Sequence, residues 1–115
     1  MNYMLLIYGN ENNYATMSKE ATEAEMQAYY AYSEAMQQAG VMVGGEALHP
    51  TATATTVQVQ NGERITTHGP FAETKEQLGG FYLLKCENLD QALEWAAKCP
   101  GAETGAIEVR PVMEF

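Results

Sequence analysis

One histidine stands where the sequence could place a proton-transfer group. His68 lies directly before the Gly69-Pro70 turn, and its backbone there is expected to be extended. An imidazole takes up and releases a proton close to neutral pH, so His68 could act as a general acid or base, held by a nearby carboxylate such as Glu73 or Glu46. The alternative is an exposed turn histidine at a position where an aspartate would otherwise cap the turn.

A polar run, Glu73-Thr74-Lys75-Glu76-Gln77, follows this turn. It could place Glu73, Thr74 and Lys75 around a small anionic or carbonyl ligand, with Lys75 supplying the counter-charge in an otherwise acidic chain. The alternative is a solvated single helical turn whose Glu and Lys side chains pair at the surface, which contributes about 0–1 kcal/mol. The sequence leaves both interpretations open.

Tyr82 and Arg110 are two further candidates for holding a carboxylate ligand. Both could face a cavity between two sheets, although Arg110 suits a salt bridge at the rim of a dimer equally well. Glu46 and His49 are three residues apart on an expected strand, so they lie nominally on opposite faces, which argues against a metal pair. With only two histidines, two distant cysteines and no dense acidic loop, no metal site is expected. Because the chain has no phosphate-binding glycine loop, no nucleotide cofactor is expected either.

Apolar patterning and capping residues predict the elements that must position these side chains. Ser18 can cap a long helix that Gly40 ends, and Asn88 can cap a second helix. The predicted elements are a strand over residues 4–8 followed by a loop at 10–13, a helix over 18–39, a strand over 41–48, a hairpin, a central strand over 81–86, a helix over 89–98 and a last strand over 106–110.

The hairpin is signalled by Asn61-Gly62 between two segments of strand-forming residues, 53–60 and 63–67. A two-residue turn would pair Val57 with Thr66, whereas a three-residue loop would pair Val57 with Ile65. The second register is preferred because it places the apolar side chains on one face. The opposite face is then polar and carries Arg64, Thr66 and His68.

The order of elements matches a ferredoxin-like α+β sandwich that carries an inserted β-hairpin. Two helices can cover only one face of its sheet, yet residues 4–8 and 81–86 are large and apolar at both odd and even positions. Burial of such a side chain contributes about 1.5–3 kcal/mol, so leaving several exposed would be a solubility liability. A second copy packed sheet to sheet is the simplest cover, and a homodimer is therefore expected.

Length and composition bound the class of protein. The chain has 115 residues, which suits a single domain over residues 1–115. Six basic and fifteen acidic side chains give a formal net charge of −9, and the basic ones are scattered, so neither nucleic acid nor an anionic membrane is an expected partner. No apolar stretch is long enough to span a membrane. Cys86 and Cys99, without CxxC spacing or a secretion signal, suggest buried reduced thiols in a cytoplasmic protein.

The segment GPFAETKEQLGGFYLL, residues 69–84, resembles the YCII-related proteins of the DGPF type, whose motif reads Asp-Gly-Pro-Phe followed by Ala-Glu-Thr-Lys-Glu-Gln-Leu-Gly-Gly. The resemblance extends to residues 4–8, 44–48, 94–97 and 108–111. It implies a ferredoxin-like fold that forms a dimeric α/β barrel. In relatives a His/Asp pair lines a cleft, which suggests enzymes, and DGPF genes often neighbour those for extracytoplasmic-function sigma factors. This chain departs from the pattern in having His68 where the motif has Asp.

The leading hypothesis from the sequence is a cytosolic homodimer with a small-molecule cleft that catalyses proton transfer of isomerase, lyase or hydrolase type. One alternative is a non-catalytic ligand-binding or regulatory module that associates with an extracytoplasmic-function sigma factor. Another is a dimer whose apolar sheet faces enclose no cavity at all.

Overall fold

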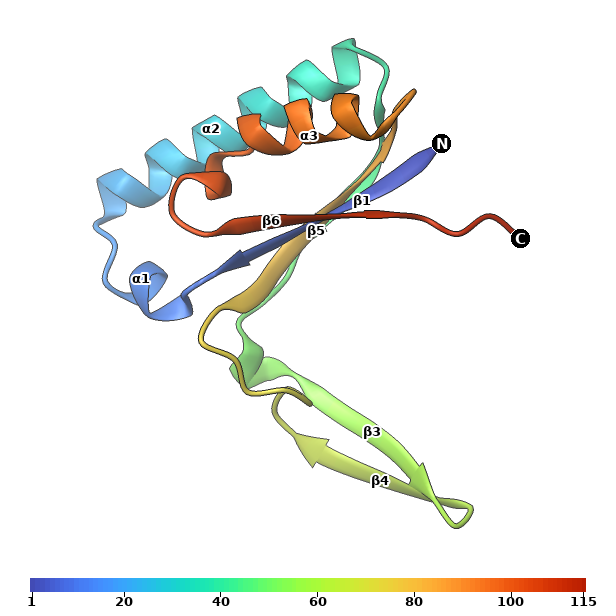
Figure 1. The fold of residues 1–115 in the computed structure, drawn as a ribbon. Helices are drawn as coiled ribbons and strands as arrows, with labels where there is room; N and C mark the ends of the chain where they lie inside the picture. The colour runs from blue at the N-terminus through green and yellow to red at the C-terminus, as the bar shows by residue number, and fades with distance from the viewer.

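The computed structural model describes residues 1–115 as a four-stranded antiparallel sheet with two long helices on one face and a projecting hairpin (Figure 1). The strands of the sheet lie in the order β2-β5-β1-β6. In chain order the elements are β1 (Asn2–Gly9), α1 (Glu11–Ala15), α2 (Lys19–Gln38), β2 (Met42–Ala47), the 3-10 turn η1 (Thr51–Thr53), β3 (Thr55–Gln60), β4 (Glu63–His68), β5 (Gln77–Lys85), α3 (Leu89–Lys98), the 3-10 turn η2 (Pro100–Ala102) and β6 (Ala106–Pro111). This confirms the predicted mixed α+β class and is consistent with a ferredoxin-like arrangement.

The predicted capping residues begin both long helices. Ser18 Oγ accepts a hydrogen bond from the backbone N–H of Ala21 at 3.1 Å, and Gly40 follows the end of α2 with a φ of 72°. Asn88 Oδ1 accepts one from the backbone N–H of Gln91 at 2.9 Å at the start of α3. These contacts satisfy amide groups that the first turn of a helix leaves free. No helix of the chain is long and apolar enough to cross a membrane.

The core lies between the two long helices and one face of the sheet. Along β1 the buried side chains are Tyr3, Leu5 and Ile7, and the residues between them are only partly buried. The other core residues are Tyr32, Met36, Val41, Leu84, Cys86, Ala92, Ala96 and Cys99. Both cysteines are buried and unpaired, as predicted.

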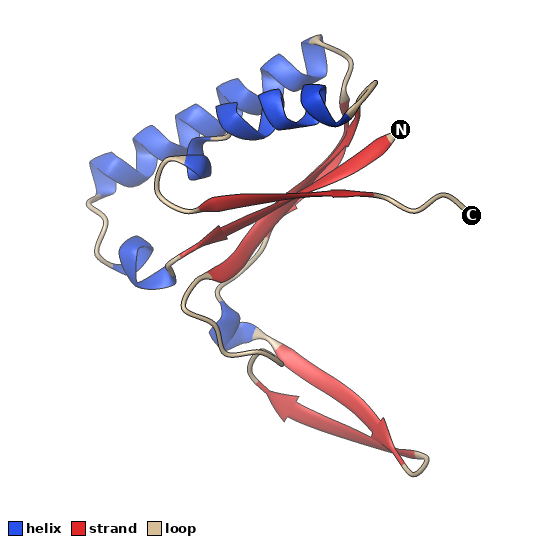
Figure 2. Cartoon of the chain, in the orientation of Figure 1, coloured by secondary structure: helices blue, strands red, loops and turns tan.

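The opposite face of the sheet has no helix over it (Figure 2). We call it the open face; its apolar side chains, all partly buried, are Met4, Leu6, Tyr8, Leu78, Phe81 and Leu83. Their cross-strand register places Leu6 opposite Phe81 and Met4 opposite Leu83. The predicted presence of apolar side chains on both faces is therefore confirmed, whereas the dimeric barrel stays a prediction.

The hairpin of β3 and β4 differs from the preferred register. Val57 pairs with Thr66, and the turn consists of Asn61 and Gly62 with φ values of 51° and 80°. Two positive φ values are typical of a type I′ turn, whose twist matches that of the flanking strands. Because neither face of the hairpin is buried within the chain, burial does not favour the longer loop. His68, Thr66 and Arg64 thus share a face with Val57 and Val59, and the prediction of a purely polar face is wrong.

Two segments are more regular than predicted. Residues 10–13, expected as a loop, include the start of α1, because Asn10 Oδ1 accepts from the N–H of Asn12 at 2.9 Å and Gln77 Oε1 accepts from the N–H of Glu11 at 3.0 Å. β5 begins at Gln77 rather than at residue 81, since residues 77–80 already pair with the end of β1. The alternative of a helical turn within residues 72–76 is not observed.

Candidate functional site

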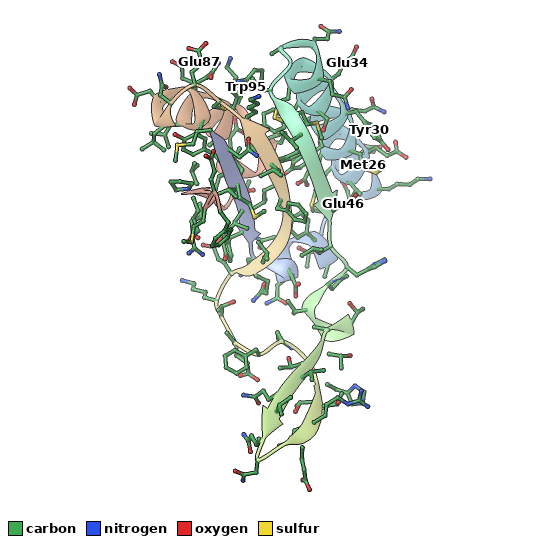
Figure 3. The ribbon with its side chains drawn as sticks, turned by 90° about the vertical axis from the view of Figure 1, so that its right-hand side faces the viewer. Met26, Tyr30, Glu34, Glu46, Glu87 and Trp95 are labelled. Carbon is green, nitrogen blue, oxygen red and sulfur yellow. The ribbon has the colours of Figure 1, made fainter.

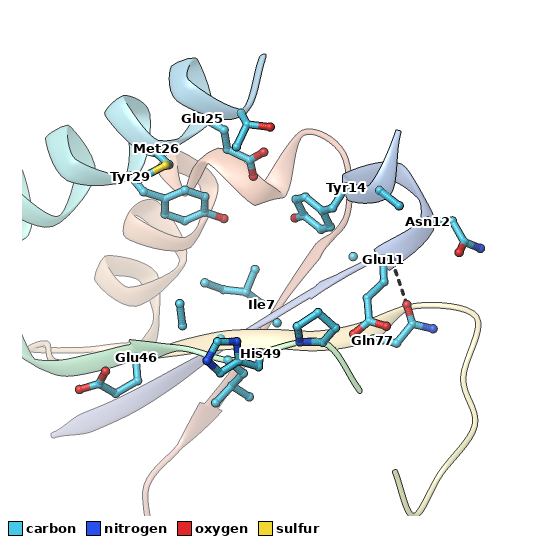
Figure 4. A pocket seen from close by; sticks show the side chains of 18 of the residues that line it. Ile7, Glu11, Asn12, Tyr14, Glu25, Met26, Tyr29, Glu46, His49 and Gln77 are labelled. Carbon is cyan, nitrogen blue, oxygen red and sulfur yellow. Dashed lines mark hydrogen bonds between the residues drawn. The ribbon is translucent and has the colours of Figure 1, made fainter. Parts of the chain in front are cut away.

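A pocket of about 850 Å³ lies between the N-terminal half of α2, the short helix α1 and the sheet beneath them (Figure 4). It exists because only the second half of α2 packs onto the sheet: the buried residues of this helix are Tyr32 and Met36. The first half instead turns toward the pocket. Its lining includes Ile7, Glu11, Tyr14, Glu25, Met26, Tyr29, Tyr30, Glu46, His49, Gln77 and Tyr82.

Tyr14 and Tyr29 face each other across this pocket, with the carboxylate of Glu25 beside them and Ile7 below (Figure 4). Burial raises the pKa of both phenols above the ordinary value, and the negative charge of Glu25 adds to the shift. Both hydroxyl groups are therefore protonated at neutral pH. They can donate hydrogen bonds to a ligand while their rings stay uncharged.

Tyr82 forms the inner wall of the pocket and is held from three sides. Its hydroxyl shares a hydrogen bond with Ser33 Oγ at 3.1 Å, and its ring lies edge-on to that of Tyr32 at 5.4 Å between centroids. A Cβ atom built on Gly45 would lie 2.6 Å from Tyr82 Cδ1. The absence of a side chain at Gly45 therefore leaves room for this ring.

Glu11 ties the rim of the pocket together. Its carboxylate accepts hydrogen bonds from the backbone N–H and the hydroxyl of Thr51, both at 2.8 Å, and its own N–H donates to Gln77. Helix α1, the turn η1 and the start of β5 are therefore linked through one residue. Because both carboxylate oxygens are engaged, Glu11 acts first as a structural anchor of the rim.

The other ionisable side chains of the lining are free of partners within the chain. Glu25 is half-buried on α2, while Glu46 and His49 lie at the exposed end of β2. None of the three forms an ion pair; the chain has one, between Arg110 and Glu108 at 4.0 Å. Figure 3 shows Glu46 on the edge strand below Met26 and Tyr30 of α2. Glu25 and His49 are available to a ligand of the pocket, whereas the side chain of Glu46, which pairs with Phe81, lies on the open face.

The pocket contains two of the sequence-predicted site residues, Glu46 and Tyr82. His68 lies at the exposed end of β4 in the hairpin, where it pairs with Thr55. The three neighbouring candidates Glu73, Thr74 and Lys75 are exposed in the connection between β4 and β5. Within one chain these four residues do not line the pocket, so their catalytic and binding roles stay predictions.

Tyr82 and Arg110 do not face the same cavity. Tyr82 pairs with Leu5 and therefore lies on the helix-covered face, whereas Arg110 pairs with Met4 and lies on the open face. The prediction that both side chains point into a space between two sheets is wrong for Tyr82. The pairing register decides this, and the sequence alone does not supply it.

Sequence reasoning missed Tyr14, Glu25, Tyr29 and His49 as pocket residues. Of these four, the sequence drew attention only to His49, as a poor metal ligand. A usable signal was present: the first half of the helix places Glu25, Met26 and Tyr29 on one side, a mixture of carboxylate and aromatic side chains that a core-facing helix surface would not carry.

Two comparisons place the chain among known sequences. The sequence profile of the YCII-related domain matches residues 1–115. An uncharacterized protein from Rhizobium meliloti (strain 1021) is 42% identical over 114 residues, which covers 97% of this chain and 92% of that protein.

Proposed function

The chain belongs to the YCII-related family, and we propose that it binds a small organic molecule in the pocket between α1, α2 and the sheet. The observation that carries this proposal is the first half of α2. It buries no residue in the core, yet it lies over the pocket with Thr22, Glu25 and Met26 in the lining, next to Tyr29, which packs partly against the core. A helix half that contributes to a cavity rather than to the core is best explained by a ligand.

The size and lining of the pocket support binding. Sites for small molecules typically measure about 300–1,000 Å³ and combine apolar walls with a few polar groups, and the volume of about 850 Å³ falls in this range. Ile7 and Met26 offer apolar contact, the four lining tyrosines offer ring faces, and Glu25 and His49 offer charge and hydrogen bonds.

We propose acid/base chemistry on the bound molecule as a second function, favoured by one observation. His49 is in the lining, so the pocket contains an imidazole together with carboxylates, which are groups that proton transfer in isomerase, lyase or hydrolase reactions employs. His68, in the projecting hairpin, and Glu73, in the connection that follows it, do not line this pocket. We propose that they act as acid/base groups at a separate site.

We also propose that two copies of the chain pack through their open faces. The chain exposes 8339 Å², about 2,100 Å² more than the roughly 6,200 Å² of a compact monomer of its mass. A standard interface covers about 800 Å² on each partner, so the excess is ample for a stable dimer. The partly buried apolar side chains of the open face supply the contact surface.

Ligand binding is tested with 4-tert-butylphenol, a neutral probe, added to the ¹⁵N-labelled protein. We expect amide signals of lining residues such as Ile7 and Gly80 to shift in a saturable way. Ala47→Trp places a large side chain into the pocket from the exposed end of β2 and should abolish the shifts. Ala97→Trp, the same change at an exposed position of α3 outside the pocket, should preserve them. If neither the parent nor the Ala97→Trp protein shows saturable shifts, the proposed function is wrong.

A further inference from the structure

The charges of the pocket are all of one sign. The chain has six basic residues, Lys19, Arg64, Lys75, Lys85, Lys98 and Arg110, and none of them lines the pocket. Two carboxylates face it, Glu11 and Glu25; Glu46 borders the pocket on the edge strand, but its pairing with Phe81 places its side chain on the open face. The only other ionisable group of the lining with a possible positive charge is His49. The potential inside is therefore negative and opposes an anionic ligand.

The carboxylate of Glu25 is the best placed of these charges. It is half-buried, it lies next to the facing tyrosines, and nothing in the chain neutralises it. After burial, its negative charge is the next cause of the raised pKa of Tyr14, and it is a lesser cause for Tyr29. A charge in such a partly desolvated position gains most from a ligand of opposite sign.

The aromatic lining has the same preference. Tyr14, Tyr29, Tyr30 and Tyr82 all border the pocket, and the face of a neutral aromatic ring attracts a cation through its quadrupole. Rings together with an acidic side chain are the usual means by which proteins recognise alkylated ammonium groups. Ile7 and Met26 can contact the apolar body of the same molecule.

The arrangement does not suit a metal ion. No group of three or more His, Cys, Asp or Glu side chains lies close enough together to hold one. The carboxylates that face the pocket, Glu11 and Glu25, instead stand apart on α1 and α2, and both oxygens of Glu11 are already engaged by Thr51.

We propose that the ligand of this pocket is a small organic cation, an ammonium compound with an apolar or aromatic body, held by Glu25 and the rings of Tyr14 and Tyr29. This inference rests on the proposed function and names the class of its ligand. It differs from the hypothesis of an anionic ligand around Lys75, which lies outside the pocket.

The test compares three probes of nearly the same shape: 4-tert-butylphenol, (4-hydroxyphenyl)trimethylammonium and 4-hydroxybenzenesulfonate. At a pH of about 6.5 the phenol group of each is neutral, so the probes differ in the charge of one tetrahedral group. Dissociation constants come from the shifts of lining amides in the ¹⁵N-labelled protein. We expect the cation to bind about tenfold more tightly than the neutral probe and the anion not to bind measurably.

Variants separate the contribution of Glu25 from general acidity. Glu25→Gln should weaken binding of the cation about three- to tenfold and leave binding of the neutral probe unchanged. Glu34→Gln is the matched control, because Glu34 lies farther along α2 with its carboxylate bonded to Gln38 (Figure 3). It should change neither constant. Tyr14→Leu keeps apolar bulk but removes an aromatic ring, and it should weaken binding of the cation more than binding of the neutral probe.

Failure of the inference and failure of the proposed function give different results. If the neutral or the anionic probe binds as tightly as the cation, or if Glu25→Gln leaves cation binding unchanged, the ligand class is wrong although the pocket still binds. If none of the three probes shifts the lining amides, both the proposed function and the inference fail.

Discussion

Individual tyrosine and cysteine side chains make the fold sensitive to alkali. Burial raises the pKa of Tyr29 and Tyr32 above the ordinary 10.0 and that of Cys99 above 9.0. In the unfolded chain these phenols and the thiol lose their protons at the ordinary pKa values, whereas in the folded chain they stay protonated to higher pH. Their contribution to stability is therefore fully present below a pH of about 9 and is lost above it. We expect the free energy of unfolding, measured with urea, to fall steadily from a pH of about 9 to 11.

Tyr32→Phe provides a check on this pH dependence. The Tyr32 hydroxyl donates a hydrogen bond to the backbone oxygen of Trp95 at 2.7 Å, so the variant should lose about 1 kcal/mol at neutral pH. Its free energy of unfolding should also decline less steeply in alkali, because one buried phenol is gone. Tyr30→Phe changes a phenol that is 63% exposed and should alter neither quantity. A parent protein whose stability is constant across this pH range would contradict the argument.

Residue-level prediction succeeded where the signal is local. Ser18, Gly40 and Asn88 act within one helical turn of their own position, so the sequence next to them contains what decides their conformation. The roles of Tyr29 and Tyr82 depend on which face of the sheet and which half of α2 they occupy. Those facts arise from the pairing of segments far apart in the chain.

At the level of single elements, the turn of the hairpin is the most specific test. Gly62 adopts a φ of 80°, a region that costs a residue with a Cβ atom roughly 1–2 kcal/mol. Gly62→Ala should therefore increase the rate of amide hydrogen exchange within β3 and β4 and leave the central sheet unchanged, because the hairpin pairs with no other strand.

Gly44→Ala is the control for this change. Gly44 does not have a positive φ, and nothing lies within 4 Å of a Cβ atom built there. The same substitution should thus leave exchange in the hairpin as it was. Equal exchange rates in the parent and the Gly62→Ala protein would show that the turn does not hold the two strands in register.

The hairpin also shows why register was harder to predict than the elements. The choice between pairing Val57 with Thr66 or with Ile65 was made by assuming that one face is buried. Within the chain both faces are exposed, so turn geometry decides instead. The two helices and the strands of the sheet were predictable because their periodicity reflects a real core.

The whole molecule is flatter than a compact domain of its length. Its radius of gyration is 16.1 Å and its extents are 47 × 44 × 19 Å, whereas a compact chain of this size has a radius near 13 Å. The proposed dimer would thicken the molecule by adding a second layer on the open face. Leu6 lies on that face, opposite Phe81.

Leu6→Glu should therefore convert the dimer to a monomer. Dimerisation would bury this charge, without a partner, at the centre of an apolar interface, which weakens association by at least about tenfold. Sedimentation velocity at micromolar concentration measures the change. Leu93→Glu, at an exposed position of α3, should remain dimeric, and far-UV circular dichroism should show both variants folded. A parent protein that sediments as a monomer would overturn the proposed dimer.

The alternation along β1 constrains how this strand can evolve. Ile7 borders the pocket between α1, α2 and the sheet, while its immediate neighbours Leu6 and Tyr8 lie on the open face. Inserting or deleting one residue within the strand would move pocket-facing side chains to the open face and open-face side chains to the pocket. Insertions and deletions should consequently be confined to the connections between elements. Substitutions along β1 should impair ligand binding at one residue and dimerisation at the next, in alternation.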